Sequence, residues 1–260
     1  MKRLLGVLVL CSFLSAQTVL AGQEEKREGW DKGQPRAEEW LFHDLPRHIG
    51  GDFKETFWNG WNLLFLAGGV GATLGVHTKD NAIRDAFQPN RPLGKTFDSA
   101  MTIGFHPIVL GGATFLALGV SKFYHADKAA LTAGTMLEAL ALTEIMTLGL
   151  KYTVRRKRPD GSSDSFPSAH ASGVFALATV AEVYYGPWVG VPSYLLASLV
   201  GVSRIDANKH FASDVIAGAV LGTLMGLGTA KWHKKEFSRF FILPTAGDGS
   251  PGVSLVYNFK

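Results

Sequence analysis

The chain is poor in cysteine and in charged residues, and both shortages narrow what the protein can be. Its one cysteine, Cys11, lies inside an apolar N-terminal run. If that run is removed, the mature protein has no thiol, which excludes disulfides, cysteine-ligated zinc and cysteine catalysis. Charged residues make up 18% of the chain, below the roughly 25% that is usual in soluble proteins. Hydrophobic residues make up 47%, so the composition favours an apolar environment.

Basic residues only slightly outnumber acidic ones, and they form no long run in the sequence. The formal net charge is +4 over 260 residues, enough for one domain with a sizeable core. A mild positive charge suits anionic lipid or phosphorylated substrates. Nucleic acid is the least favoured partner, because the sequence has no long basic run with interleaved aromatic residues.

The first residues have the pattern of a secretion signal. Lys2 and Arg3 precede an apolar stretch over residues 4–14, and small residues around Ala21 offer a cleavage site before Gly22. The stretch is short for a membrane-spanning helix, although an uncleaved anchor is the alternative. We therefore expect a signal peptide over residues 1–21 and export to a bacterial-type cell envelope.

The rest of the chain divides by composition into three parts. Residues 22–56 form a polar N-terminal arm, residues 57–235 a helical domain, and residues 236–260 a tail. The middle part contains long apolar runs that lack the alternation of strands. We expect an all-α bundle of about six apolar helices, with Gly186 and Pro187 separating the fourth from the fifth. Two β-prone stretches around a Gly/Pro-rich segment predict a short hairpin in the tail. The apolar runs cover residues 57–76, 101–120, 129–150, 171–185, 188–202 and 215–230.

A basic cluster, KYTVRRKRP at residues 151–159, follows the third apolar run. Lys151 and Arg158 are seven residues apart, so in a continuous helix they would share one face, and Pro159 would then end that helix. Phosphate needs several fixed cations, and these side chains supply a point charge and a bidentate fork. The alternative is that the cluster only terminates a membrane helix.

A second cluster, FPSAH at residues 166–170, opens the fourth apolar helix. Ser168 suits a helix N-terminus, where backbone amides and the helix dipole favour an anion. His170 can exchange a proton near neutral pH. A capping serine beside an ordinary histidine explains this short pattern equally well.

A third cluster lies just before the last apolar run. It contains Ser203, Arg204, His210 and Asp214. The histidine and the aspartate are four residues apart and would be adjacent on a helix. A carboxylate beside an imidazole fixes its tautomer and stabilises its charged form. A solvated ion pair is the simpler explanation for this cluster alone.

Taken together, the order Lys-x6-Arg-Pro, Pro-Ser-x-His, Ser-Arg-x5-His-x3-Asp resembles the type 2 phosphatidic acid phosphatase superfamily. That superfamily includes lipid phosphatases, bacterial class A acid phosphatases and vanadium haloperoxidases. The motifs span residues 151–214, and the helical setting matches over about residues 57–232. The sequence departs from the family pattern at Ala169, where glycine is usual and where a positive φ would be strained. The gap between Pro159 and Pro167 is also short.

The resemblance implies a role for each matching position. His210 would attack phosphorus to form a phosphohistidine, Asp214 would orient it, and His170 would protonate the leaving alcohol and then activate water. The implied activity is hydrolysis of a lipid phosphate, a lipid pyrophosphate or a small phosphomonoester. It requires no metal and no cofactor, because cations and amides receive the phosphoryl charge. The implied phosphate-binding groups are Lys151, Arg158, Ser168, the Ala169 amide, Ser203 and Arg204.

Two other functions fit parts of the pattern. A vanadate-dependent haloperoxidase would use the same pocket, because vanadate mimics the phosphoryl transition state, but this chain is short for that scaffold. A non-enzymatic envelope protein could use the basic cluster to hold anionic lipid, but it would not need two histidines. The remaining histidines, including His233, show no metal-ligand spacing. Glutamates such as Glu138 are costly in lipid, and we expect them to face the bundle interior.

The expected signal conflicts with the expected membrane topology. Lipid phosphatases of the superfamily resemble six-span proteins with the site on the outer face and a first helix that begins inside. A cleaved signal places residue 22 outside, and three crossings would then put residues 151–170 in the cytoplasm. We expect membrane association with a periplasm-facing site, which requires that one apolar run does not span or that the first run is not a signal. A soluble periplasmic bundle is the alternative.

Overall fold

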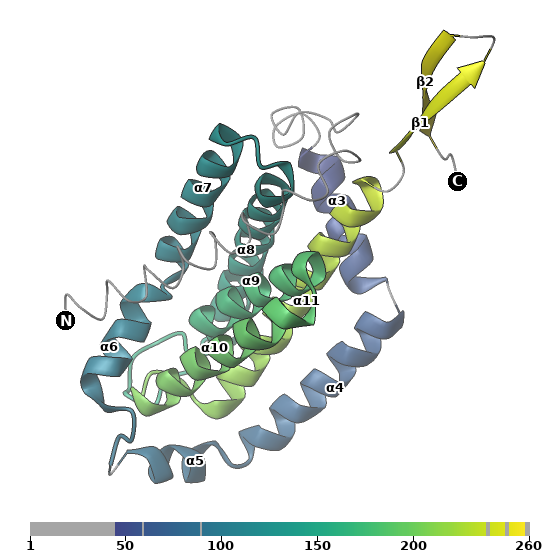
Figure 1. Ribbon diagram of the computed structural model, residues 1–260. Helices are drawn as coiled ribbons and strands as arrows, with labels where there is room; N and C mark the ends of the chain where they lie inside the picture. The colour runs from purple at the N-terminus through teal and green to yellow at the C-terminus, as the bar shows by residue number, and fades with distance from the viewer. Residues whose placement is uncertain (1–44, 59, 89, 238–239, 248–249, 258–260) are drawn as a thin grey trace. The chain divides into compact units, whose positions relative to one another are not determined.

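The structure is a computed structural model that describes residues 45–237, except 59 and 89, and residues 240–247 and 250–257 (Figure 1). The predicted signal peptide and residues 22–44 of the predicted arm lie outside the described residues. The chain divides into two compact units. One of them, Asp44–His233, contains the helices that carry the motifs, and the other contains the C-terminal hairpin.

The helical unit confirms the expected all-α class. Five of the six predicted apolar runs lie mainly on one helix each, and the second run is divided near Phe105 between two helices, so the described residues form more helices than the predicted six. Among neighbouring helices in the sequence, α7 packs on α8, α8 on α9, and α9 on α10. The described helices are α3 (Leu45–Phe57), α4 (Gly60–His77), α5 (Asp80–Phe87), α6 (Gly94–Gly104), α7 (Pro107–Phe123), α8 (Asp127–Val154), α9 (Ala169–Tyr185), α10 (Pro187–Asp206) and α11 (Ala212–Phe237).

The expected tail hairpin is present. Strands β1 (Phe240–Gly247) and β2 (Ser250–Tyr257) pair antiparallel, with Phe240 opposite Tyr257 and Gly247 opposite Ser250. The two strands therefore meet at the Gly/Pro-rich segment that the sequence marked as a turn.

The ends of the central helices follow local chemistry, with one exception to expectation. Helix α9 starts directly after Ser168 and ends before Gly186, whose φ of 79° suits glycine, and Pro187 begins α10. Pro159 does not end α8. The helix stops at Val154, and Arg155 adopts a left-handed conformation with φ of 48°. The expectation that Lys151 and Arg158 share one helical face is therefore wrong.

Glycines let α11 approach α9 closely. A methyl group at Gly218 would lie 2.6 Å from the carbonyl oxygen of Ser168, and one at Gly226 would lie 2.6 Å from that of Ala176. Gly222, between them, would meet the Ser172 carbonyl even more closely. This four-residue spacing presents one glycine face to α9, and it fixes the start of α11 beside the start of α9.

Part of the predicted polar arm is a packed helix. Helix α3 places Phe53 and Phe57 against Leu142 of α8 and against Leu221 and Met225 of α11. Both phenylalanines are partly buried, so together they contribute less than the roughly 3–6 kcal/mol of two fully buried side chains. Residues 45–57 thus belong to the compact helical unit.

The bundle has small residues inside and large apolar residues outside. Its core is rich in alanine and in threonines whose hydroxyls bond back to the helix, such as Thr143 to the Ala139 carbonyl at 2.6 Å. Large apolar side chains are exposed on several helices, which is costly in water and favourable in lipid. Three helices, α8, α10 and α11, are long and apolar enough to cross a membrane, or four spans if bent α6 and α7 form one. Exposed examples include Leu64, Ile108, Phe115, Ile145, Trp188 and Leu195.

Candidate active site

The structure brings the three sequence clusters together at the C-terminal end of α8 and the N-terminal ends of α9 and α11. The amide of Ser168 donates a hydrogen bond to the carbonyl oxygen of Asp214 at 3.0 Å, which joins the second cluster to the third. The guanidinium of Arg156 donates to the Asp214 carboxylate at 2.7 Å, which joins the first to the third. Residues from positions 151 to 214 therefore form one site.

Lys151 and Arg158 converge on a single acceptor although they do not share a helix. The Lys151 ammonium donates to the carbonyl oxygen of Asp164 at 2.6 Å, and the Arg158 guanidinium lies 3.5 Å from the same oxygen. Arg158 also donates to the Ser163 carbonyl at 2.9 Å. The loop after α8 thus folds back and holds both cations in one place.

Ser168 and Ala169 form the N-terminus of α9. Ser168 is fully buried, and its hydroxyl has no hydrogen-bond partner among the described residues. It does not cap the helix with its side chain, so the hydroxyl stays available to a ligand. Ala169 is the first helical residue and is not among the described residues with positive φ. The strain anticipated from replacing the family's glycine is therefore absent at this alanine.

Thr102 on α6 links His170 to Arg204. Its carbonyl oxygen accepts a hydrogen bond from His170 Nε2 at 3.0 Å, and its hydroxyl accepts one from Arg204 Nη2 at 2.6 Å. The Arg204 guanidinium also donates to the Asp98 carbonyl at 3.1 Å and is 2% exposed. Because a carbonyl only accepts, the proton on His170 sits on Nε2, and Nδ1 is left to exchange a proton.

Ser203 is the one predicted phosphate ligand that points elsewhere. Its hydroxyl is fully buried and donates to the Val200 carbonyl within α10 at 2.7 Å. A hydroxyl engaged with its own helix in this way has its proton used by the backbone. The structure therefore places Ser203 in support of α10 beside Arg204.

His210 lies before α11, not on it, yet it remains close to Asp214. Its Nδ1 is 3.8 Å from Asp214 Oδ2, too long for a hydrogen bond. That oxygen instead accepts from the Ser165 hydroxyl and from the Phe211 amide, the latter at 2.9 Å. His210 is 3% exposed. Its backbone amide donates a hydrogen bond to the Arg204 carbonyl oxygen at 3.2 Å.

Sequence reasoning missed Arg156 and its partners. The Arg156 guanidinium donates to Ser213 Oγ and Asp214 Oδ1, each at 2.7 Å, and to Asp80 Oδ2 at 2.8 Å. Its plane also lies over the Phe211 ring, 4.2 Å from the centroid. The basic run at residues 155–158 contained the signal, but four adjacent cations gave no means of choosing among them. Asp80, far away in the sequence, gave none.

Burial keeps both site histidines neutral at pH 7. It lowers the pKa of His210 to about 4, against the opposing effect of Asp214, and Arg158 and Lys151 lower it further. Burial also lowers the pKa of His170 to about 4, opposed by the Thr102 carbonyl and reinforced by Arg204, His106 and His210. A neutral imidazole has the free lone pair that a nucleophile or a base requires.

The site is built to receive an anion. It gathers two guanidinium groups, an ammonium, a helix N-terminus and a hydroxyl, which all donate hydrogen bonds. Three buried polar atoms have no partner among the described residues: Ser168 Oγ, Arg204 Nε and His210 Nδ1. The nearby carboxylates of Asp214 and Asp80 are both held by Arg156. Such a donor set fits phosphate oxygens better than a metal ion.

Comparison with known proteins finds one matching family model and several similar phosphatases. Residues 132–238 match the model of the PAP2 superfamily. The chain is 44% identical over 101 residues to the lipid A 1-phosphatase of Porphyromonas gingivalis, covering 36% of this chain and 23% of that protein. It is 28% identical over 138 residues to the undecaprenyl-diphosphatase BcrC of Bacillus subtilis, covering 50% and 71%. It is 36% identical over 88 residues to the decaprenylphosphoryl-5-phosphoribose phosphatase of Mycobacterium tuberculosis, covering 30% and 48%.

The match to the first of these relatives spans less than a quarter of that relative's length. Among solved structures, the transmembrane PAP2 type phosphatidylglycerolphosphate phosphatase of Bacillus subtilis aligns with a TM-score of 0.44 and 26% identity, over 66% of this chain and 94% of that one. All three sequence clusters lie within the matched family segment. The similarity to the PAP2 superfamily therefore covers the part of the chain that carries the candidate site.

Proposed function

We propose that the protein is a phosphatase that hydrolyses a lipid phosphate or lipid pyrophosphate through a phosphohistidine on His210. The observation that carries the proposal is the convergence of Lys151, Arg158, Ser168 and Arg204 near two neutral histidines, of which His210 is buried and His170 is partly buried. The match of residues 132–238 to the PAP2 superfamily model and the names of the relatives, which are phosphatases, support it.

In the first step, His210 Nε2 attacks phosphorus as the ester P–O bond breaks. His170 gives a proton to the leaving oxygen. The incoming phosphate raises the pKa of His170, because a nearby anion favours imidazolium. Charge on the phosphoryl oxygens is received by the cations, the Ser168 hydroxyl and the Ala169 amide.

In the second step, neutral His170 removes a proton from water, and the water oxygen attacks phosphorus as the P–N bond to His210 breaks. Inorganic phosphate leaves and both histidines return to their starting states. Every proton is carried by His170. The residues of the site supply both the nucleophile and the charge stabilisation, so the proposal needs no metal at this site.

The proposed substrate is a lipid because of what surrounds the site. The helices that hold the motifs expose large apolar side chains, and three of them, α8, α10 and α11, are long and apolar enough to span a membrane. We propose that the protein is exported and inserted in the membrane with its site toward the periplasm. A lipid headgroup would then meet Lys151 and Arg158 at the end of α8.

The decisive assay measures phosphate release from phosphatidate and from p-nitrophenyl phosphate in detergent with EDTA. We expect activity in the wild type, inhibition by vanadate, and a loss of at least 1,000-fold in His210→Ala, which removes the nucleophile. His125→Asn is the control, because His125 is exposed and lies between α7 and α8. Full activity in His210→Ala would overturn the proposed mechanism.

A further inference from the structure

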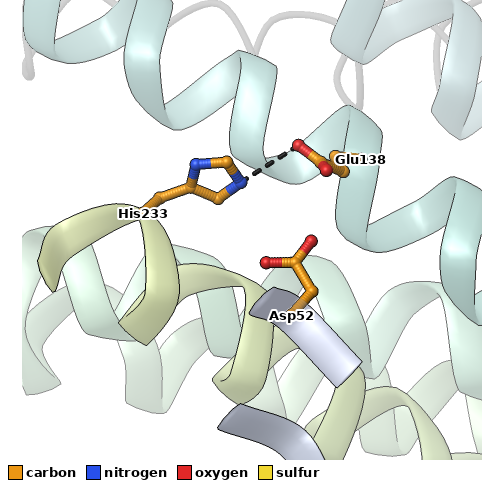
Figure 2. A group of neighbouring side chains, drawn as sticks. All are labelled: Asp52, Glu138 and His233. Atoms are coloured by element: carbon orange, nitrogen blue, oxygen red, sulfur yellow. Dashed lines mark hydrogen bonds and ion pairs between the residues drawn. The ribbon is translucent and has the colours of Figure 1, made fainter. Parts of the chain in front are cut away.

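Three ionisable side chains from separate helices meet in a second buried cluster, away from the phosphate site. Asp52 comes from α3, Glu138 from α8 and His233 from α11, and Figure 2 shows them pointing toward one another. One ligand atom from each lies within 4.8 Å of the others. His233 Nε2 and Glu138 Oε2 are 3.0 Å apart. Sequence spacing gave no sign of these neighbours of His233, because they come from distant positions in the chain.

This cluster is remote from the site of phosphate chemistry. Glu138 precedes Lys151 by 13 residues on α8, and His233 follows Asp214 by 19 residues on α11. At 1.5 Å per residue these separations are about 20 Å and about 28 Å along the helices. A ligand bound to the cluster cannot touch the reacting phosphate.

Asp52 gives the independent sign that a ligand belongs here. Its side chain is fully buried, and neither carboxylate oxygen has a hydrogen-bond partner among the described residues. A buried carboxylate without a partner is strongly disfavoured unless it is paired, protonated or bound to a metal. Its oxygens face Glu138 and His233 (Figure 2), so the unsatisfied groups point into the cluster.

Close packing holds α3 against α11 on both sides of Asp52. A methyl group at Gly51 would overlap the indole ring of Trp232, and one at Gly228 would overlap Thr56. Gly51 and Trp232 are the immediate neighbours of Asp52 and His233 in the sequence. These contacts bring the backbones that carry Asp52 and His233 close together.

We propose that Asp52, Glu138 and His233 bind one divalent transition-metal cation, Zn²⁺ or Mn²⁺, that ties α3 to α8 and α11. One imidazole and two carboxylates are ligands that both ions accept. Two carboxylates also neutralise the double charge of the ion. Ligand atoms around tetrahedral Zn²⁺ are roughly 3.3 Å apart, given metal–ligand distances near 2.0 Å. Small side-chain rotations bring the cluster to that spacing, and water completes the coordination.

The proposal does not depend on the phosphatase mechanism. The bound ion acts on stability, because it binds the folded protein and not the separated helices. It supplies no group to the phosphate site. Loss of the ion therefore lowers the melting temperature while turnover, measured well below that temperature, persists.

The test measures Zn²⁺ and Mn²⁺ binding to the purified full chain in detergent after EDTA treatment. Isothermal titration is expected to show one saturable site for at least one of the two ions, and the melting temperature should rise by several degrees at saturation. Glu138→Gln and Asp52→Asn should weaken binding at least 10-fold and remove the thermal shift. Glu144→Gln is the matched control, because Glu144 lies on the same helix, six residues further on.

A wild-type measurement keeps the test independent of whether the variants fold. Co²⁺ added to the EDTA-treated wild type should give a visible absorption band typical of a nitrogen- and oxygen-ligated ion, displaced by Zn²⁺. Failure of the wild type to bind Zn²⁺, Mn²⁺ or Co²⁺ would overturn the proposal and leave a proton shared by the carboxylates. Equal Zn²⁺ affinity in the wild type, Asp52→Asn and Glu138→Gln would overturn it as well.

Discussion

Arg156 holds two carboxylates that come from distant parts of the chain, and its loss should damage the site without removing a catalytic group. It donates one hydrogen bond each to the Asp214 carboxylate, the Asp80 carboxylate and the Ser213 hydroxyl. Among the described residues, Arg156 is the one cationic side chain that forms an ion pair with Asp214, since His210 is neutral. In Arg156→Ala both carboxylates stay buried with less compensation, which costs about 3–5 kcal/mol when a buried pair is broken.

We therefore predict that Arg156→Ala lowers kcat by 10- to 100-fold and lowers the melting temperature. Arg156→Lys should recover only part of kcat, since an ammonium cannot reproduce the planar fork. The adjacent Lys157→Ala is the control, because Lys157 is exposed. Equal losses in Arg156→Ala and Lys157→Ala would show that the charge of the loop matters and the specific contacts do not. Steady-state kinetics and thermal unfolding check both.

His210 makes stability depend on pH in a direction that its burial determines. Folding lowers its pKa from 6.5 to about 4, so between these values the unfolded chain binds a proton that the folded protein does not. The stability that depends on His210 is complete above pH 6.5 and is lost as the pH falls toward 4. At pH 4.5 the loss is on the order of 2 kcal/mol.

His210→Gln, which cannot titrate, should lack this part of the pH dependence. Melting temperatures of the wild type and the variant are measured from pH 7.5 to 4.5. Their difference is expected to stay constant above pH 6.5 and to change below it. The wild type should lose stability faster on acidification. His170 titrates in both proteins and cancels in the comparison. Parallel curves down to pH 4.5 would contradict a buried, neutral His210.

At the scale of elements, the glycine face of α11 determines whether the site is assembled. Gly222 faces the Ser172 carbonyl so closely that a methyl group must separate α11 from α9. That separation would pull Asp214 from the Ser168 amide, a contact of 3.0 Å. Gly222→Ala should destabilise the protein by about 1–3 kcal/mol, the usual range for overpacking, and should reduce kcat/KM.

Gly119→Ala is the matched change on α7, where a methyl group would meet no atom within 4 Å among the described residues. It should be neutral or stabilising by up to about 1 kcal/mol, since alanine favours a helix over glycine. Thermal unfolding and phosphate release measure both variants. The close packing of α9 and α11 would be refuted if Gly222→Ala behaved like Gly119→Ala.

Local patterns predicted the elements and the residue types of the site, and tertiary contacts supplied the rest. The start of α9 at Ser168 followed from helix-start chemistry, and the pairing of clusters followed from the family motif. The end of α8 could not be predicted from the sequence, because Arg155 adopts a left-handed conformation and the helix stops before Pro159. The hydroxyl of Ser203 could not be placed either, since its bond to Val200 depends on a rotamer.

The same limit explains the two features that sequence spacing missed. Arg156 meets Asp80 across 76 positions, and Asp52 meets Glu138 and His233 across still larger separations. Motif spacing detects residues that one loop or one helix turn brings together. Contacts between α3, α5, α8 and α11 are set by packing, which a single sequence does not display.

At the scale of the whole helical unit, apolar faces outside and small or polar residues inside suit a bilayer. Helix α8 alone has 28 residues, about 42 Å at 1.5 Å per residue, which exceeds the roughly 30 Å of a hydrocarbon core. Asp127 begins α8, and Lys157 lies just past its C-terminal end beside the phosphate site. These two exposed positions should therefore lie on opposite sides of the membrane.

The side of the membrane on which each position lies can be measured by cysteine labelling. The chain has a single cysteine, so an introduced cysteine becomes the one labelling site once Cys11 is replaced. In a Cys11→Ser background, Lys157→Cys and Asp127→Cys are expressed separately and treated with a membrane-impermeant maleimide in spheroplasts. A periplasm-facing site predicts labelling of Lys157→Cys in intact spheroplasts and of Asp127→Cys only after lysis, because α8 separates the two by a full bilayer. The reverse pattern would place the phosphate site in the cytoplasm, and labelling of both positions before lysis would mean that α8 does not span.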